Sequence, residues 1–215
     1  MDAPILLVLA GPNGGGKSSI GGAYLRSVGL DYYDAEDFAR GLQPVDAQAL
    51  ERALSLAWHE GRRRLQDAVS RRRSFAIETT LGGTTLPSLV DAAADRGFHV
   101  HIWYFGLDSA VDHVRRAATR QAMNGIAIPA DLINTRWTGC RENLLALLPK
   151  VMGLRLFDNS TDRDPTSVIT PPPRLLLDLR NGILSPPSPS LAASTPDWAR
   201  PLIEAALTAR YQIGI

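Results

Sequence analysis

"LAGPNGGGKSSI", residues Leu9–Ile20, is the stretch that decides the fold. The aliphatic run ILLVL in front of it has the length and the continuous hydrophobicity of a strand that is covered on both faces. Gly11, four further residues and then Gly16-Lys17-Ser18 match the pattern G-x-x-x-x-G-K-[ST]. The residues that follow predict a helix. A strand, a glycine-rich loop and a helix in this order predict a phosphate-binding loop, or P-loop.

In a P-loop the glycines let backbone amides turn inward on phosphate groups, and the dipole of the following helix adds a favourable potential. Lys17 would bridge the β and γ phosphates, and the hydroxyl of Ser18 would complete the coordination of Mg²⁺. We therefore expect Mg²⁺ and ATP as cofactors, with GTP as the alternative. A merely flexible turn would not need the lysine, the serine, the strand and the helix in register. The predicted nucleotide-binding residues are Gly11, Pro12, Asn13, Gly14, Gly15, Gly16, Lys17, Ser18 and Ser19.

Composition limits the class of protein. The chain has 215 residues, of which 45% are hydrophobic and 21% charged, as in an ordinary globular protein with a sizeable core. A net charge of +1 gives no reason to expect a nucleic-acid partner. The single cysteine, Cys140, excludes an internal disulfide. The apolar run at residues 4–10 is too short for a membrane span and lacks a signal-cleavage pattern, so we expect a cytoplasmic protein with no membrane partner.

Strand-like and helix-like segments alternate along the first three quarters of the chain. Such alternation requires crossover connections, and it predicts an α/β fold in which a parallel sheet has helices on both faces. The expected strands are Ile5–Leu9, Leu30–Tyr33, Ser74–Thr79, His99–Phe105 and Leu154–Phe157. The expected helices are Lys17–Ser27, Asp46–Ser70, Leu86–Arg96, Ser109–Met123 and Ala130–Leu148.

The C-terminal part of the chain has a different composition. Prolines precede the run RLLLDLRNGIL, in which Asn181-Gly182 predicts a hairpin turn or an irregular appendage. Residues 185–194 are rich in serine and proline and predict a loop, and Pro196–Tyr211 predicts a final helix. We expect a P-loop kinase-like core at residues 1–164, with a lid around 116–137, and a small C-terminal extension at 165–215 packed on the core.

Acidic and hydroxyl side chains follow two of the expected strands. Carboxylates near a bound triphosphate are electrostatically costly unless they hold Mg²⁺, orient a hydroxyl or take its proton. This favours a function for Glu36 and Glu78, whereas Asp34 and Asp37 could equally cap the next segment. The predicted acceptor-binding residues are Asp34, Glu78, Thr79 and Thr80.

Three arginines flank a loop after the fourth expected strand. Arg116 and Arg120 are four residues apart and share a helix face, and Arg136 lies beyond residues 124–129. From such positions they could cover the transferring phosphoryl group and neutralise its charge. The alternative for any surface arginine is a solvated basic face, which is our interpretation of residues 62–64 and 71–73.

A P-loop alone does not distinguish kinases from other nucleotidases. The string GPNGGGKSS is close to that of ABC transporter ATPases, but their L-S-G-G-Q signature is absent. Guanine recognition by N-K-x-D requires a lysine, and the chain has only Lys17 and Lys150. A small kinase-like fold remains, in which an acceptor lies over the carboxyl edge of the sheet under a lid.

The sequence resembles the zeta-toxin-like kinases, including small members described as predicted ABC-type ATPases. The resemblance covers residues 3 to about 160 in order. It runs through GPNGGGKSS, YYDAEDFARGLQP, SFAIETTLGG, GFHVHIWYFGLDS, the segment Arg116–Trp137 and LFDNS. It implies a P-loop kinase fold, phosphorylation of the sugar 3′-hydroxyl of UDP-N-acetylglucosamine, and control by an antitoxin.

Carried over by position, the resemblance gives Lys17 and Ser18 the phosphate and Mg²⁺ roles and places Arg116, Arg120 and Arg136 in the lid. Two positions depart from the family pattern. Glu36 replaces the aspartate that serves as general base, and Ile126 follows Asn124-Gly125 where the family has a histidine. We expect a small-molecule kinase of zeta-toxin type. The alternatives are a kinase for another hydroxyl compound and a nucleotide-binding regulatory module with little transfer activity.

Overall fold

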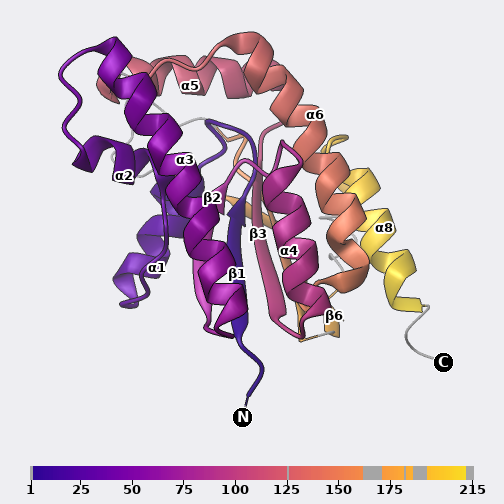
Figure 1. Cartoon of the computed structure of the whole chain (residues 1–215). Helices are drawn as coiled ribbons and strands as arrows, with labels where there is room; N and C mark the ends of the chain where they lie inside the picture. Colours follow the sequence, from indigo (N-terminus) through magenta and orange to yellow (C-terminus); the bar gives the residue numbers. More distant parts are fainter. Residues whose placement is uncertain (1, 125, 162–170, 182, 186–192, 212–215) are drawn as a thin grey trace.

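The computed structural model describes residues 2–124, 126–161, 171–181, 183–185 and 193–211. A six-stranded sheet in the order β2-β1-β3-β4-β5-β6 forms its centre (Figure 1). The first four strands in this order are parallel, and β5 and β6 continue the sheet antiparallel. The strands are β1 Ile5–Ala10, β2 Phe75–Thr79, β3 His99–Gly106, β4 Gly153–Asp158, β5 Arg174–Arg180 and β6 Ile183–Ser185.

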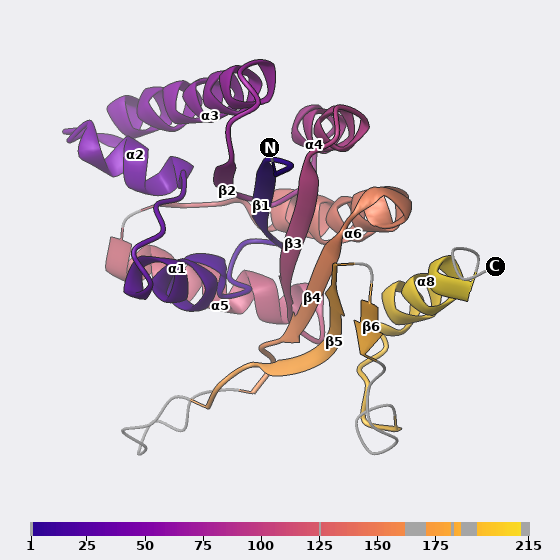
Figure 2. The same ribbon diagram turned by 90° about the horizontal axis from the view of Figure 1, so that it is seen from below.

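Helices cover both faces of the sheet, which confirms the expected α/β architecture (Figure 2). The larger hydrophobic core lies under α3, α4, α6 and α8, and a smaller one lies under α1 on the opposite face, where α5 also lies. None of the described helices is long and apolar enough to cross a lipid bilayer. The helices are α1 Ala23–Ser27, α2 Ala35–Gly41, α3 Ala47–Ser70, α4 Thr85–Asp95, α5 Ala110–Asn124, α6 Ala130–Leu147 and α8 Arg200–Tyr211, with short turns η1 Lys17–Gly22 and η2 Leu148–Lys150.

The first helix begins as a wide turn directly at the P-loop lysine. η1 is π-helical over Lys17–Gly22 and passes into α1 without a break. Gly16, with φ 106°, supplies the left-handed residue in front of it, a conformation that a side chain would strain. The expected helix at Lys17–Ser27 is therefore present, with a non-standard first part.

The expected strand Leu30–Tyr33 is wrong. Only Tyr33 forms a bridge, parallel to Ile77 on the outer side of β2. The Tyr33 amide donates to the Ala76 carbonyl at 2.9 Å, and the Tyr33 carbonyl accepts from the Glu78 amide at 2.8 Å. Leu30 is 53% exposed, so the segment lacks the burial that would extend the pairing. The single bridge still matters, because it sets Asp34 beside the end of β2.

The C-terminal segment completes the same sheet and core. β5 and β6 form a hairpin, the first of the two alternatives that the sequence left open, in which Arg180 pairs with Ile183 and Asn181 adopts φ 49°. β5 pairs with β4, and Trp198 packs against Tyr104 at 5.9 Å between ring centroids. The expected boundary at 164/165 and most of the expected loop at 185–194 lie outside the described residues, so the division into core and extension stays a prediction.

Candidate active site

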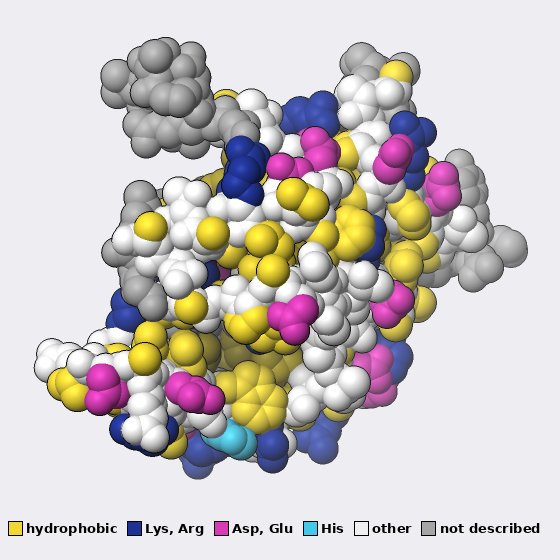
Figure 3. All heavy atoms as spheres, turned by 90° about the horizontal axis from the view of Figure 1, so that it is seen from above, with side chains coloured by type: hydrophobic (Ala, Val, Ile, Leu, Met, Phe, Trp, Pro, Cys, Tyr) yellow, Lys and Arg dark blue, Asp and Glu magenta, His cyan; other side chains and the backbone are white. Residues whose placement is uncertain are grey.

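A cavity of about 510 Å³ opens at the carboxyl ends of β1 and β2. Seen from above, it is a hollow with hydrophobic side chains around it (Figure 3). Its lining also contains most of the polar side chains that the sequence singled out. These are Asn13, Lys17, Asp34, Glu36, Glu78, Thr79, Thr80 and Arg136.

The walls of the cavity are mostly apolar. They come from α3, the start of α4, and the lid segment that leads into α6. Trp58 on α3 and Ile126, in the segment before α6, belong to these walls. Ile126 thus lines the cavity at the position where the resembled family has a histidine. Arg62 is the charged side chain of the wall formed by α3. The wall residues are Leu54, Ala57, Trp58, Gly61, Arg62, Leu86, Pro87, Ile126, Ala127, Ile128, Pro129 and Leu132.

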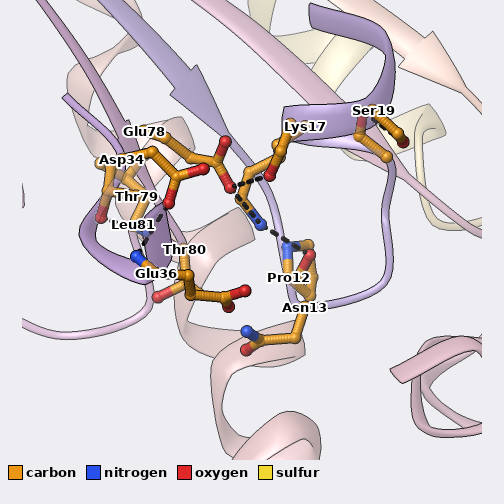
Figure 4. A network of polar contacts seen from close by, with 12 residues as sticks. Pro12, Asn13, Lys17, Ser19, Asp34, Glu36, Glu78, Thr79, Thr80 and Leu81 are labelled. Carbon is orange, nitrogen blue, oxygen red and sulfur yellow. Dashed lines mark hydrogen bonds and ion pairs between the residues drawn. The ribbon is translucent and has the colours of Figure 1, made fainter. Parts of the chain in front are cut away.

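Lys17 is held at the inner end of this cavity. Its side chain is 6% exposed, and Nζ donates to the Pro12 carbonyl at 3.1 Å and lies 3.8 Å from Glu78 Oε1 (Figure 4). Gly11, with φ 129°, lies against the next strand, and a β-carbon there would come within 2.2 Å of the Phe105 carbonyl oxygen. The P-loop is thus pressed onto the end of the sheet, with its lysine directed toward the carboxylates.

Glu78 and Ser18 form a pair that fits Mg²⁺. Ser18 Oγ donates to Glu78 Oε1 at 2.9 Å, and Oε2 is buried without a hydrogen-bond partner among the described residues. Burial is the main cause that raises the pKa of Glu78 to about 7, against the lowering effect of Lys17. Mg²⁺ prefers oxygen ligands and usually combines one or two protein oxygens with phosphate oxygens and water. Accordingly, the described residues contain no cluster of three acidic, histidine or cysteine side chains that would hold a metal alone.

The three acids of the DAED segment have different surroundings. Asp34 caps α2, because its side chain accepts from the amides of Glu36 at 2.8 Å and Asp37 at 3.3 Å. It also lines the cavity, and burial raises its pKa. Asp37 pairs with Arg40, and its side chain is 54% exposed. Glu36 lines the cavity and accepts from Arg120 Nη2 at 2.9 Å.

The lid arginines separate into two groups. Arg120 reaches Glu36 across the cavity, and Arg136 Nη1 donates to Asn13 Oδ1 of the P-loop at 2.9 Å. Burial lowers the pKa of Arg136. Arg116 Nη2 instead donates to the carbonyls of Thr161 at 3.1 Å and Ser160 at 3.4 Å, beyond the end of β4. Arg116 therefore lies against the residues that follow β4 and does not belong to the lining of the cavity.

Thr79 and Thr80 shape the loop after β2. Their hydroxyls accept from the amides of Leu81 at 3.0 Å and Gly82 at 3.4 Å, and Leu81 is held at φ 57°. A β-carbon on Gly82 would lie 2.9 Å from Arg136 Cα, so the glycine lets α6 approach the loop. The close approach places Arg136 over the floor of the cavity.

Sequence reasoning missed two side chains that hold the site together. Asn143 on α6 donates to the carbonyls of Leu81 at 2.7 Å and Gly83 at 2.8 Å, which fixes the loop after β2. A polar residue directly before the buried Leu144 was the available signal. The second is His113 on α5, which is fully buried and contacts the Asn13 carbonyl of the P-loop at 2.8 Å. Nothing in the helical pattern of α5 indicates that the P-loop lies against this residue.

Comparison with known proteins agrees with this geometry at the level of fold. No protein-family model matches the chain. An uncharacterized protein of Haemophilus influenzae is 26% identical over 136 residues, which are 59% of this chain and 88% of the relative. A structure of the AvrRxo1-ORF1:-ORF2 complex with ATP superimposes with a TM-score of 0.65 at 13% identity, covering 97% of this chain and 76% of the other.

A second structural neighbour belongs to a toxin-antitoxin system. The structure from the PezAT chromosomal toxin-antitoxin system of Streptococcus pneumoniae has a TM-score of 0.50 at 15% identity, covering 74% of this chain and 68% of the other. These neighbours confirm the expected α/β fold, a largely parallel sheet with helices on both faces. At such identities the likeness is one of fold, and the chemistry has to be argued from the site.

Proposed function

We propose that this protein is a Mg²⁺- and ATP-dependent kinase that transfers the γ-phosphoryl group to a hydroxyl of a small molecule. One observation supports the proposal most directly. Lys17 of the P-loop lines a walled cavity of about 510 Å³, and the carboxylate of Glu36 lies in the same cavity, where it accepts a hydrogen bond from Arg120. A mechanical ATPase or a regulatory GTPase has no need of such an acceptor cavity beside its nucleotide.

The proposed roles follow from position. The P-loop amides and Lys17 bind the phosphates, and Ser18 and Glu78 supply oxygen ligands for Mg²⁺. The metal ion would neutralise charge on the phosphate oxygens. Glu36 accepts the proton of the attacking hydroxyl, which Thr79, Thr80 and Asp34 help to orient. Arg120 and Arg136 stabilise the charge that develops on the transferring group, and Arg116 contacts the nucleotide side.

For the acceptor we propose a nucleotide sugar such as UDP-N-acetylglucosamine, following the resemblance through ETTLGG. The apolar walls, to which α3 contributes one arginine, Arg62, keep a second candidate open, a small hydroxyl compound with a hydrophobic body. The neighbouring proteins were solved as AvrRxo1-ORF1:-ORF2 and as part of the PezAT toxin-antitoxin system. By analogy, an inhibitory antitoxin is the proposed protein partner.

Transfer of label from γ-labelled ATP tests the proposal. In the presence of Mg²⁺, the wild-type protein should label UDP-N-acetylglucosamine or another hydroxyl compound, and Lys17→Ala should abolish transfer and weaken ATP binding while the fold is kept. Label on a different hydroxyl compound, with none on the nucleotide sugar, would select the second candidate. Binding of ATP without transfer to any acceptor in a broad panel would favour the regulatory module, and equal turnover by Lys17→Ala would exclude the assignment of the P-loop.

A further inference from the structure

Three side chains contact backbone carbonyl groups of the P-loop. Lys17 Nζ donates to the Pro12 carbonyl at 3.1 Å, His113 Nδ1 contacts the Asn13 carbonyl at 2.8 Å, and Asn159 Nδ2 donates to the Gly15 carbonyl at 3.0 Å. The first belongs to the P-loop motif itself. The other two come from α5 and from the end of β4, 100 and 144 residues away along the chain.

The contacts of His113 fix its tautomer. A carbonyl oxygen only accepts, so Nδ1 carries the proton that is donated to Asn13. Nε2 is then the acceptor for the amide of Leu107 at 3.2 Å. Both ring nitrogens are satisfied in a fully buried, neutral imidazole, and the ring cannot turn without losing both contacts. His113 is therefore a rigid support for the Asn13 carbonyl.

Holding a carbonyl also holds the amide of the next residue. The peptide unit is planar and trans, so the carbonyl of one residue and the N–H of the next lie on opposite edges of one plane. His113 binds the Asn13 carbonyl, so the N–H of Gly14 points away from His113. Asn159 binds the Gly15 carbonyl, so the N–H of Gly16 points away from Asn159. Inward-facing amides are the groups with which a P-loop binds phosphate.

We propose that His113 and Asn159 are positioning residues of the nucleotide site, which aim the amides of Gly14 and Gly16 at the triphosphate. The packing supports rigid contact at both places. A β-carbon on Gly14 would lie 2.9 Å from the His113 carbonyl oxygen, and one on Gly16 would lie 2.6 Å from Asn159 Nδ2. The proposal rests on the proposed nucleotide function and assigns it two residues outside the P-loop motif.

The position of His113 also couples the P-loop to the lid. His113, Arg116 and Arg120 are three and four residues apart on α5 and share one face of the helix. Asn13 is held twice, by His113 through its carbonyl and by Arg136 of α6 through its side chain at 2.9 Å. The two helices α5 and α6 are thus bonded to the same P-loop residue, Asn13. A shift of the P-loop is therefore transmitted to both helices.

Affinity for a non-hydrolysable ATP analogue with Mg²⁺, measured by calorimetry, tests the proposal. His113→Gln places its amide where Nε2 lies and leaves the Asn13 carbonyl without a donor, whereas His113→Asn keeps a donor near Nδ1. We expect His113→Gln and Asn159→Leu each to weaken binding roughly ten-fold to a hundred-fold, the cost of a buried carbonyl without its partner. His113→Asn should recover most of the affinity. Binding of AMP, which lacks the β and γ phosphates, should change much less.

Thr119→Val on α5 is the matched control, because it removes a hydrogen bond to the Arg115 carbonyl on the exposed side of the same helix. It should bind the analogue as the wild type does. Circular dichroism establishes whether each variant is folded. If His113→Gln is unfolded, the affinity of Asn159→Leu for the analogue tests the positioning role. Wild-type affinity in the folded variants would overturn the positioning role. Absence of binding by the wild-type protein itself would instead overturn the nucleotide function, and this proposal with it.

Discussion

At the scale of single residues, the acid at position 36 is the least conventional feature of the site. A glutamate is one methylene longer than the aspartate that the resemblance leads one to expect, so its carboxylate must be positioned differently. The structure places it in the cavity and in contact with Arg120 at 2.9 Å. An arginine at this distance orients the carboxylate and must also leave room for the acceptor hydroxyl.

We predict that Glu36→Gln lowers turnover by about a hundred-fold to ten-thousand-fold, the usual contribution of a general base, while ATP affinity barely changes. The substitution keeps the size of the side chain and removes its basicity. Steady-state kinetics with the identified acceptor and calorimetry with ATP are the measurements.

Asp34→Asn and Asp37→Asn are the controls for this experiment. Asp37 is more than half exposed and pairs with Arg40, so Asp37→Asn should have near wild-type turnover. Asp34 lines the cavity beside Glu36, but its carboxylate caps α2. Normal turnover in Glu36→Gln together with an inactive, folded Asp34→Asn would assign the base to Asp34.

At the scale of elements, α5 carries Arg116 and Arg120 on the same face as His113, which contacts the P-loop. Arg120 is bonded to Glu36, which lies 84 residues away in α2, so this contact links the lid to the acceptor side of the site. Because developing charge on the phosphoryl group is strongest in the transition state, an arginine that binds it acts mainly on turnover.

We predict that Arg120→Ala lowers kcat with little change in the Michaelis constant for ATP. Arg115→Ala is the matched control, since Arg115 pairs with Asp112 at 3.1 Å on another face of the same helix, and it should have wild-type kinetics. An increase in the Michaelis constant alone, with kcat unchanged in Arg120→Ala, would show that Arg120 binds the ground state and has no special role in transfer.

At the scale of the whole molecule, buried ionisable groups under the P-loop govern how stability responds to acid. Burial lowers the pKa of His113 from 6.5 to about 4. The unfolded chain therefore binds a proton at pH values where the folded chain does not, and acidification from pH 6.5 to about 4 favours unfolding. The contribution of His113 to the free energy of unfolding is complete above pH 6.5 and is lost below pH 4, a change of about 3 kcal/mol.

Glu78 opposes this trend, because its pKa is raised from 4.5 to about 7 and acidification between these values favours the folded state. The opposite effects of His113 and Glu78 predict that the free energy of unfolding of the wild type changes little between pH 7 and about 4.5. In His113→Gln only the effect of Glu78 remains, so we predict that the variant becomes more stable on acidification over this range. Denaturant unfolding at pH 7 and near pH 4.5 should show that the stability advantage of the wild type over the variant narrows on acidification. An advantage independent of pH would contradict the buried, neutral state of His113.

The sequence by itself determined the local features of this protein. The P-loop, the strands β1 to β4, the longer helices and the turn at Asn181 follow from patterns within a few residues, because glycine and periodicity act over that range. The same patterns predicted a strand at Leu30–Tyr33 that is absent and did not predict α2. The polar residues at the ends of β1 and β2 were found for the same reason, since parallel neighbouring strands bring their carboxyl ends to one edge.

Only the tertiary structure decided which of these residues meet. It joined Glu36 to Arg120 and Asn13 to Arg136, directed Arg116 toward the residues after β4, and turned Asp37 away from the cavity. It also placed Asn143 in a supporting role, and it placed His113 in one that the pattern of its own helix does not indicate. These contacts depend on how α5 and α6 pack over the sheet, and the free energy of that packing comes from apolar surface spread along the whole chain, so no short stretch of sequence carries the information.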